Sequence, residues 1–385
     1  MISMIKRKKI YFKVFAIFII VFNLLSTSYA TEVVSDSVNF GNYVSTIDEY
    51  INSTELNNVI DTSDIATKLL TGQSIDKSGI LLKLLTLIAK EVLIALRGAI
   101  IIYIIIILMG VLSSLEQENE SGIVKVTYFV CFLMIASIAI KTFVQILFMF
   151  KGTVGLITTL MQVISPFLMT VLIASGAITT TGIIQPMLLF VASLVGFIVN
   201  YIVIPFICIS VALNVINGLS DKLNFLRLSN LFSKTSIWII GVVLTVFLGI
   251  LSLETNITSS VDTLALKTTQ AAVSNFVPVV GKFFSDSFET VIGATKIVGK
   301  VGGTLGILAI VFVTIIPIIK ILSVMVIYKL LAALAEPIMV DKNILKTIDM
   351  FSDNYKTLLG ILIGIAILFI ISTGIVLNLS TSIIK

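Results

Sequence analysis

The chain has 385 residues, of which 57% are hydrophobic and 12% are charged. Soluble domains carry roughly 25% charged residues, so this composition excludes a soluble globular protein, and the apolar content excludes a disordered chain. The formal net charge of +5 arises in residues 1–30, which hold five basic residues and no acidic one, while beyond them 26 − 5 = 21 basic residues balance 21 acidic ones. We therefore expect an integral membrane protein with no surface for nucleic acid.

The side-chain inventory argues against an enzyme. The sequence has no histidine, which removes Ser-His-Asp triads, histidine-ligated metals and histidine pH switches. Cys131 and Cys208 lie in apolar runs without a CxxC partner, which favours buried free thiols. Gly281-Lys282 is followed by Phe283, so the pattern of a nucleotide-binding loop fails. We expect no catalysis, no cofactor and no metal.

Residues 1–30 have the order of a secretory signal peptide. A basic stretch over 6–13 precedes the apolar run Val14–Leu25, and small residues stand at the third and first positions before a cut after Ala30. An uncleaved first anchor is the alternative, although the run is short for a span of about 20 residues. In both cases the basic end stays in the cytoplasm and Thr31 begins outside.

Residues 31–91 form the long polar stretch near the start of the chain. They hold nine acidic residues and four lysines. Their apolar residues recur at roughly helical spacing, as in Val44, Ile47 and Ile51. We expect short amphipathic helices on the outer face of the membrane.

Apolar runs long enough to cross a bilayer, which takes about 20 residues, recur along the rest of the chain. They are Val92–Leu115, Ile123–Phe150, Val154–Gly176, Thr235–Leu253, Gly303–Ala335 and Thr357–Leu379. A further run, 183–217, is either one Pro-kinked helix or a hairpin that turns near residues 200–205. We expect an all-α, polytopic membrane helix bundle of about seven spans, with one set of helices over 92–253 and a second set over 304–385.

Residues 254–303 interrupt this pattern. They balance four acidic against four basic residues and carry an apolar stripe that includes Phe276 and Phe283. The segment is too polar to span a bilayer plainly and too apolar for a free loop. We expect interfacial or re-entrant helices that protein contacts shelter.

Three lysines, Lys141, Lys320 and Lys329, lie within or beside apolar runs. A charge at mid-bilayer costs about 3 kcal/mol on insertion scales, so each lysine either lines a polar pathway or extends toward the headgroups. Pro317 precedes Lys320 by three residues and predicts a kink there. Lys329 and Glu336 are seven residues apart, on one helix face, and are expected to pair.

Glycines at four-residue spacing predict close contacts between helices. The pairs are Gly299 with Gly303, Gly302 with Gly306, and Gly360 with Gly364. Internal packing is the first expectation for these contacts, and subunit assembly is the alternative.

The stretch 262–293 carries a family resemblance. Its most specific part is the segment Asn-Phe-Val-Pro-Val-Val-Gly-Lys over 275–282, and Pro317, Lys320, Tyr328 and Lys329 follow in the next apolar run. Together these elements resemble the stage III sporulation protein AE family. The residues that the resemblance marks for assembly or a pathway are Asp262, Lys267, Asn275, Phe276, Pro278, Gly281, Lys282, Asp286, Gly293, Pro317, Lys320, Tyr328 and Lys329.

The resemblance implies a multi-pass protein of the mother-cell membrane that surrounds the forespore. The implied role is a membrane platform or conduit in a secretion-like channel, or feeding tube, required for endospore development. The implied partners are other proteins of the stage III sporulation A operon, including the ATPase stage III sporulation protein AA and ring-forming subunits. Stage II sporulation protein Q is an indirect partner, and a homo-oligomer is compatible with this role.

Two other functions fit the residues. A self-contained permease for a small solute is favoured by the long, Pro-interrupted runs 183–217 and 303–335, although the two halves show no convincing repeat. A passive scaffold without a pathway is the remaining alternative.

Overall fold

The computed structural model describes residues 40–52, 68, 77–114, 122–219, 225–276, 281–338 and 342–382, and their regular structure is helical with no strand. The predicted signal peptide, 1–30, lies outside these residues. The helices are α2 (Phe40–Asn52), α4 (Lys77–Ser114), α5 (Gly122–Ala174), α6 (Ile178–Ile198), η1 (Val199–Val203), α7 (Ile204–Leu219), α8 (Leu226–Phe276), α9 (Gly281–Ala335) and α10 (Lys342–Ser382). The all-α expectation is confirmed.

The helices are longer than the apolar runs predicted. α5 has 53 residues and passes through Lys151 and Gly152 without a break, where we expected two separate spans. A single glycine inside a helix costs only about 1 kcal/mol, which is too little to end a helix packed on its neighbours. Within the described residues, six helices are long and apolar enough to cross a membrane.

Residues 178–219 form one continuous run of α6, η1 and α7. The predicted hairpin near residues 200–205 is therefore wrong, and the alternative of one helix is confirmed. η1 is a five-residue π-helical turn that stands just before Pro205. Proline lacks an N–H group and displaces the carbonyl four residues earlier, and a wider turn at this point accommodates that displacement.

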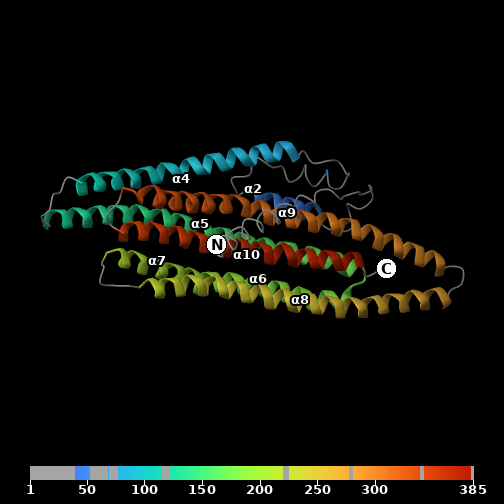
Figure 1. Ribbon diagram of the computed structural model, residues 1–385. Coiled ribbons are helices and arrows are strands. Elements are labelled where there is room, and N and C mark those ends of the chain that lie inside the picture. The colour runs from blue at the N-terminus through green and yellow to red at the C-terminus, as the bar shows by residue number, and fades with distance from the viewer. Residues whose placement is uncertain are drawn as a thin grey trace.

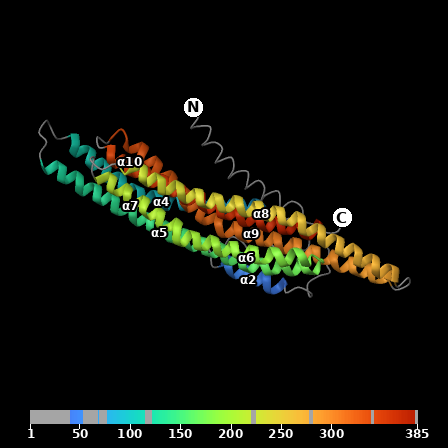
Figure 2. The same ribbon diagram turned by 90° about the horizontal axis from the view of Figure 1, so that it is seen from below.

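α10 occupies the centre of the bundle, where it packs against α9, α5, α8 and α7 (Figure 1). Its side chains Phe351, Tyr355 and Phe369 are fully buried. The bundle is elongated, with the α8–α9 pair extending past the other helices at one end and α4 and α5 at the opposite end (Figures 1 and 2). The segment 254–303 is thus divided between the end of α8 and the start of α9.

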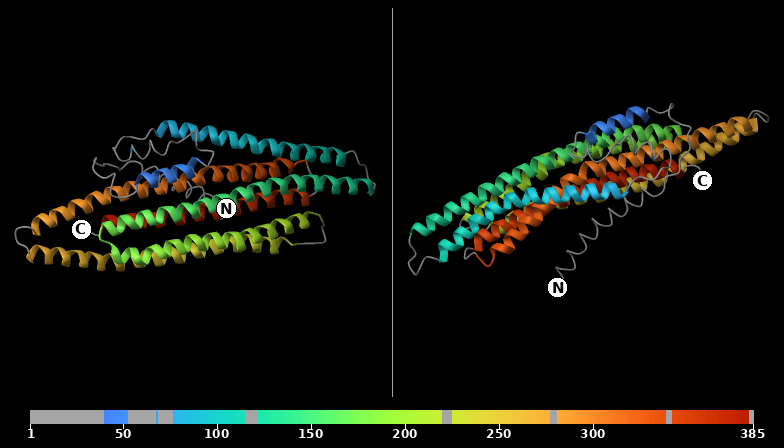
Figure 3. Two further views of the ribbon diagram at one scale, coloured as in Figure 1. Left: turned by 180° about the vertical axis from the view of Figure 1, so that it is seen from behind. Right: turned by 90° about the horizontal axis from the view of Figure 1, so that it is seen from above.

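α2 lies across the outside of the bundle against α5 and α9 (Figure 3). It buries Tyr43, Ile47 and Ile51 on one face. The Tyr43 ring stacks on Phe167 at 3.9 Å between centroids, and its hydroxyl donates a hydrogen bond to the carbonyl of Gly302 at 2.9 Å. Because Tyr43 is buried, its pKa is raised far above the ordinary value, and the phenol stays neutral.

Three of the predicted glycine contacts hold the helices together. A Cβ at Gly302 would overlap the Phe167 ring, and one at Gly303 would lie 2.5 Å from Leu377. Gly306 faces Ile164 and the Tyr43 hydroxyl. Close approach of α9 to α5, α10 and α2 therefore requires glycine at these positions, which confirms internal packing as their role.

A belt without charged residues crosses the bundle. It comprises residues 152–174 of α5, 235–253 of α8, 301–319 of α9 and 357–382 of α10. The run α6–α7 also belongs to it, since residues 178–219 carry no charge. The stretches on α8 and α9 are each about 28 Å long at 1.5 Å per residue, close to the roughly 30 Å hydrocarbon core of a bilayer. This belt is the part of the protein that fits a membrane.

One edge of the belt, called here the lysine edge, is defined by Lys151, Lys234, Lys320 and Lys356. The contacts that set the relative heights of their helices are Gly306 with Ile164, Gly303 with Leu377, and Gly364 with Ile240. Counting along each helix from these contacts places the four lysines within about 8 Å of one depth. The side chains of Lys151, Lys234 and Lys356 are exposed, as lysines that reach for headgroups are.

Gly302→Ala should lower the stability of the purified protein by about 1–3 kcal/mol, because the new methyl group must displace the Phe167 ring. The matched control is Gly374→Ala, since nothing lies within 4 Å of a Cβ there, and it should keep or raise stability. Thermal unfolding in detergent measures both variants. Equal melting temperatures for the two would contradict the close-contact role of Gly302.

Candidate functional site

An ion pair joins α4 and α9 at the lysine edge. The Lys320 Nζ lies 3.8 Å from the Glu91 Oε1, and the side chains are 23% and 8% exposed. A carboxylate this buried is costly unless it is paired, so the contact ties α4 to the rest of the bundle. Pro317 stands one turn earlier, inside the unbroken helix α9.

Glu91 is a partner that the sequence analysis missed. It was counted with the polar segment 31–91, but that boundary falls inside α4, which begins at Lys77. An acidic residue bordered by the apolar runs of 84–89 and 92–96 was the available signal. A lone acid there predicts a buried basic partner, and Lys320 provides one.

Tyr328 and Lys329 follow Lys320 on α9. They lie beyond the lysine edge, outside the belt. Tyr328 is buried, and its ring contacts Tyr355 edge-on at 5.3 Å between centroids. Lys329 pairs with Asp349 of α10, so the predicted pairing with Glu336 is wrong. Residues seven apart on one helix are about 10 Å apart along its axis, whereas Asp349 lies directly across the α9–α10 hairpin.

The carboxylate of Asp262 caps the start of α6 from the side. Its Oδ1 accepts a hydrogen bond from the Thr179 N–H at 3.0 Å, and its Oδ2 accepts one from the Thr180 N–H at 2.9 Å. The first N–H groups of a helix have no partner within the helix, and the helix dipole favours an anion there. α8 therefore fastens the α5–α6 connection, which turns through Gly176 at a φ of 88°.

The hydrogen bonds determine the charge state of Asp262. Burial of the side chain tends to raise the pKa of its carboxyl, but the hydrogen bonds from Thr180 and Thr179 outweigh burial, and the pKa lies below its ordinary value. Asp262 is 2% exposed and beyond the end of the belt on α8. Asp262 is thus an ionised cap at neutral pH, and it lies at the end of the bundle opposite the lysine edge.

A second polar cluster, which the sequence analysis missed, links α7, α8 and α10. The Ser210 hydroxyl lies 2.8 Å from the hydroxyls of both Ser229 and Ser233 and donates to the Asn354 Oδ1 at 3.0 Å. Ser233 donates to the same Asn354 oxygen at 3.0 Å. Scattered serines in apolar helices give no periodic signal, so this cluster could be found only from the packing.

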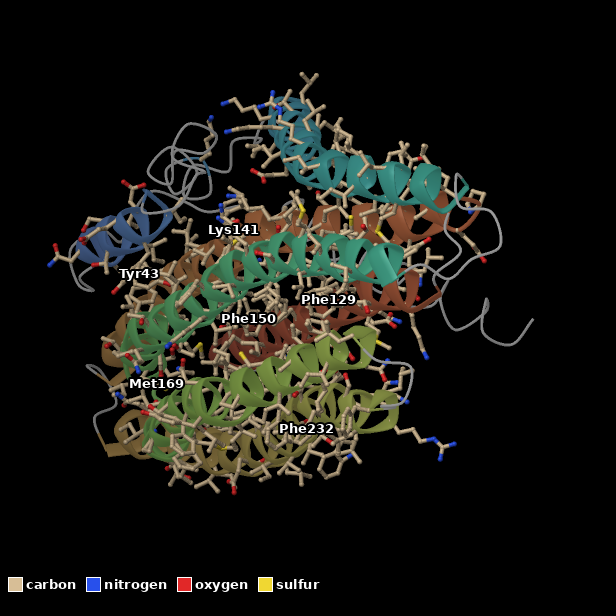
Figure 4. All side chains as sticks on the ribbon, turned by 90° about the vertical axis from the view of Figure 1, so that its left-hand side faces the viewer. Tyr43, Phe129, Lys141, Phe150, Met169 and Phe232 are labelled. Atoms are coloured by element: carbon tan, nitrogen blue, oxygen red, sulfur yellow. The ribbon has the colours of Figure 1, made fainter. Side chains whose placement is uncertain are left out.

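The other residues of the predicted set are spread over two helices and form no common cluster. Lys267 is exposed on α8, and Asn275 and Phe276 are the last two residues of that helix. The first turns of α9 contain Gly281, Lys282, Asp286 and Gly293. Pro278 lies outside the described residues. Lys141 is exposed on α5 (Figure 4).

The two cysteines are both free. Cys131 is buried as expected, but Cys208 is exposed on α7, so the prediction of burial is wrong for it. Within the described part of the chain, no three acidic or cysteine side chains come together in a group that could hold a metal ion.

A family model described as Stage III sporulation protein AE matches residues 60–380, which include the ion pair and the Asp262 cap. The chain belongs to the stage III sporulation protein AE family. The curated Stage III sporulation protein AE of Bacillus subtilis (strain 168) is 26% identical to it over 260 residues. That match covers 68% of this chain and 65% of the relative, so the chain spans just under two thirds of the relative's length. No solved structure matches.

Family membership places the chain in sporulation, and the six apolar helices make it a multi-pass membrane protein. The resemblance that the sequence analysis drew from residues 262–293 is therefore confirmed at the level of the family.

Lys320→Met should destabilise the protein by up to about 3 kcal/mol, because it removes the positive charge that lies 3.8 Å from the buried Glu91 carboxylate. Adding Glu91→Gln should recover most of that loss, since the pair is then neutral. The control is Lys141→Met, an exposed position where the change should stay within about 0.5 kcal/mol. A double variant no more stable than Lys320→Met alone would show that the pair contributes nothing.

Asp262→Ala should loosen the α5–α6 connection, because the Thr179 and Thr180 N–H groups lose their acceptor, and leaving the buried Thr180 donor unsatisfied costs about 1–3 kcal/mol. Hydrogen exchange at the Thr179 and Thr180 amides should quicken in the variant. Since the folded pKa of Asp262 is lowered, its contribution is present at neutral pH and lost as the pH falls below about 3.9, the ordinary value. Unchanged exchange at neutral pH, with Asp353→Ala as the exposed control, would contradict the cap.

Proposed function

We propose that the chain is a membrane platform in the complex that joins the mother cell to the forespore. Three features support this function: membership of the family, six helices that can cross a membrane, and helices that extend well beyond the belt on both sides. The single observation that carries the proposal is the α8–α9 projection. A protein that served only to seal or anchor in a bilayer would not need helices of this length.

The projection is formed by the end of α8 after Glu254 and the start of α9 before Lys300. Each helix continues for roughly 20 residues past the belt, which corresponds to about 30 Å. This is the part of the chain that holds the family-like segment. Figure 1 shows it extending past the other helices. In the proposed function it is the surface that meets partners in the space between the two membranes.

The orientation follows from the charges. Lysines gather at one edge of the belt, and basic residues are enriched on the cytoplasmic side of membrane proteins. The lysine edge therefore faces the mother-cell cytoplasm in this proposal, and the α8–α9 projection faces the forespore. This arrangement agrees with the predicted secretory leader, which puts residue 31 on the outer side.

The proposed partners are those that the family resemblance implies. Ring-forming proteins of the same operon would contact the projection, and through them stage II sporulation protein Q of the forespore membrane. The ATPase stage III sporulation protein AA would contact the cytoplasmic end. These partners are implied by the family resemblance, and the two projecting ends supply separate surfaces for them.

A platform accounts for the interior better than a self-contained permease does. Transporters place broken helices and their polar groups near mid-membrane. Here the π turn, Pro317 and the Lys320–Glu91 pair lie at or near one edge of the belt, and the centre is filled by buried apolar side chains of α10 and α9. The ion pair then has an architectural role, which a neutral pair can replace, whereas a pathway would require its charges.

The projection can be tested by photocrosslinking in sporulating cells. A photoreactive residue at Leu264, which is 67% exposed on α8 beyond the belt, should capture another sporulation protein. The matched control is Leu253, also 67% exposed but within the belt, where only lipid is expected. Immunoblotting and mass spectrometry identify the products. Absence of any protein product at Leu264 in cells that form normal spores would overturn the proposed role of the projection.

A further inference from the structure

The part of α4 that follows Glu91 and the first half of α5 lie beyond the lysine edge, on the side away from the belt. Glu91 of α4 pairs with Lys320 at that edge. Gly110 of α4 lies against Ile338, three residues after the end of α9. The 110 − 91 = 19 intervening residues correspond to about 28 Å along the axis. Residues 126–140 of α5 precede Lys151 by 11 to 25 positions, or about 16–38 Å. Figure 1 shows both helices extending past the others at this end.

This protruding end is as apolar as the belt itself. There is no charged residue from Gly98 to Ser114 of α4 or from Val126 to Ile140 of α5. The most exposed large apolar side chains there are Ile100, Ile101, Ile104, Leu108 and Val111 on α4, and Val126, Phe129 and Met134 on α5, each at least 50% exposed. Phe129 is labelled in Figure 4, which looks along the bundle from this end and shows α4 at its periphery with α5 beside it.

A surface of this kind needs a cover. Two neighbouring helices over 17 residues present about 25 Å by 20 Å, or about 500 Å², which is the size of the largest apolar patches on soluble proteins, and such patches are often binding surfaces. The contacts of Glu91 and Gly110 put this surface at another depth than the belt, beyond the lysine edge. The charges of α4 itself, at Lys83, Lys90, Glu91 and Arg97, fall at the level of the belt or just beyond its edge, which shows that this helix is out of register with the lipid-facing helices.

We propose that the protruding face of α4 and α5, called here the α4–α5 face, is the contact between neighbouring copies of this chain in one membrane. The cover must present apolar surface at a fixed depth beyond the lysine edge. A second copy in the same bilayer presents such a surface at that depth by symmetry. Copies that associate about an axis normal to the membrane also have parallel α4 helices.

The spacing along α4 suits such a contact. Ile100, Ile104, Ile107 and Val111 are all exposed and recur at intervals of four, three and four residues. This is the repeat by which parallel helices interlock side chains in a coiled coil. About 500 Å² from each copy gives a total near the roughly 1,000 Å² of a specific interface.

This inference goes beyond the proposed function, because it requires no sporulation partner. The test therefore uses the full chain in membranes of a bacterium that does not form spores. Cys131 and Cys208 are replaced by alanine, and a single cysteine is introduced by Ile104→Cys. A short bis-thiol reagent should then produce a covalent dimer. Val246→Cys is the matched control, because Val246 is 53% exposed on α8, on the opposite side of the bundle from α4.

The possible results distinguish whether a second copy, water, lipid or another protein contacts the α4–α5 face. Crosslinking in the Ile104→Cys variant and not in the Val246→Cys variant supports the proposal. Labelling of the Ile104→Cys variant by a water-soluble maleimide in opened vesicles, without crosslinking, shows a bare surface, and labelling only by a membrane-soluble reagent shows lipid. Capture of a different protein shows another partner. Each of these last three results overturns the proposal.

A second variant tests the same contact without thiol crosslinking. Ile104→Asp introduces a charge into the seam and should lower the co-purification of two differently tagged copies at least tenfold. The control is Ser252→Asp, an exposed polar position on α8 at the other edge of the belt, which should leave co-purification unchanged. Equal co-purification of the Ile104→Asp variant and the unaltered chain would overturn the proposal.

Discussion

The thickness of the hydrocarbon layer is the constraint on which the rest of the structure depends. A bilayer core is about 30 Å thick, whereas α5, with 53 residues, is about 80 Å long. Lipid can stabilise only the belt between the lysine edge and the region of Glu254 and Lys300. The apolar helix faces beyond it must be covered by protein, since neither headgroups nor water solvate them well.

The polar contacts are placed accordingly. Asp262 fastens α8 to the start of α6 beyond one edge, and Lys320 with Glu91 fastens α9 to α4 at the other. Within the belt, the serine and threonine hydroxyls mostly bond to carbonyls of their own helix, as Thr314 and Ser372 do. Strong cross-links are thus concentrated where the helices leave the lipid, and apolar packing and glycine contacts suffice between them.

Sequence alone could supply the class of fold and the family, because these depend on composition and on short motifs. It could also supply the glycine contacts at 302, 303 and 306, since the spacing itself describes a helix face. It could not supply the continuity of α5, because Lys151-Gly152 satisfies every local signal for a break and only packing on α9 and α10 overrides it. Nor could it identify Lys320 as the partner of Glu91, or the acceptor role of Asp262, because the partners are far apart in the chain.

The same limit explains α4. Its run from 92 to 115 has the length and hydropathy of a span, but these properties record only that water is excluded from the side chains. Depth is a property of contacts, and the contacts of Glu91 and Gly110 place the charge-free half of α4 beyond the lysine edge. The length of the apolar run therefore shows that α4 avoids water, but it does not show whether lipid or protein covers the helix. The charged residues of α4 lie at the level of the charge-free belt of its neighbours, so its apolar half lies at another depth. Protein is therefore favoured over lipid as the cover of that half.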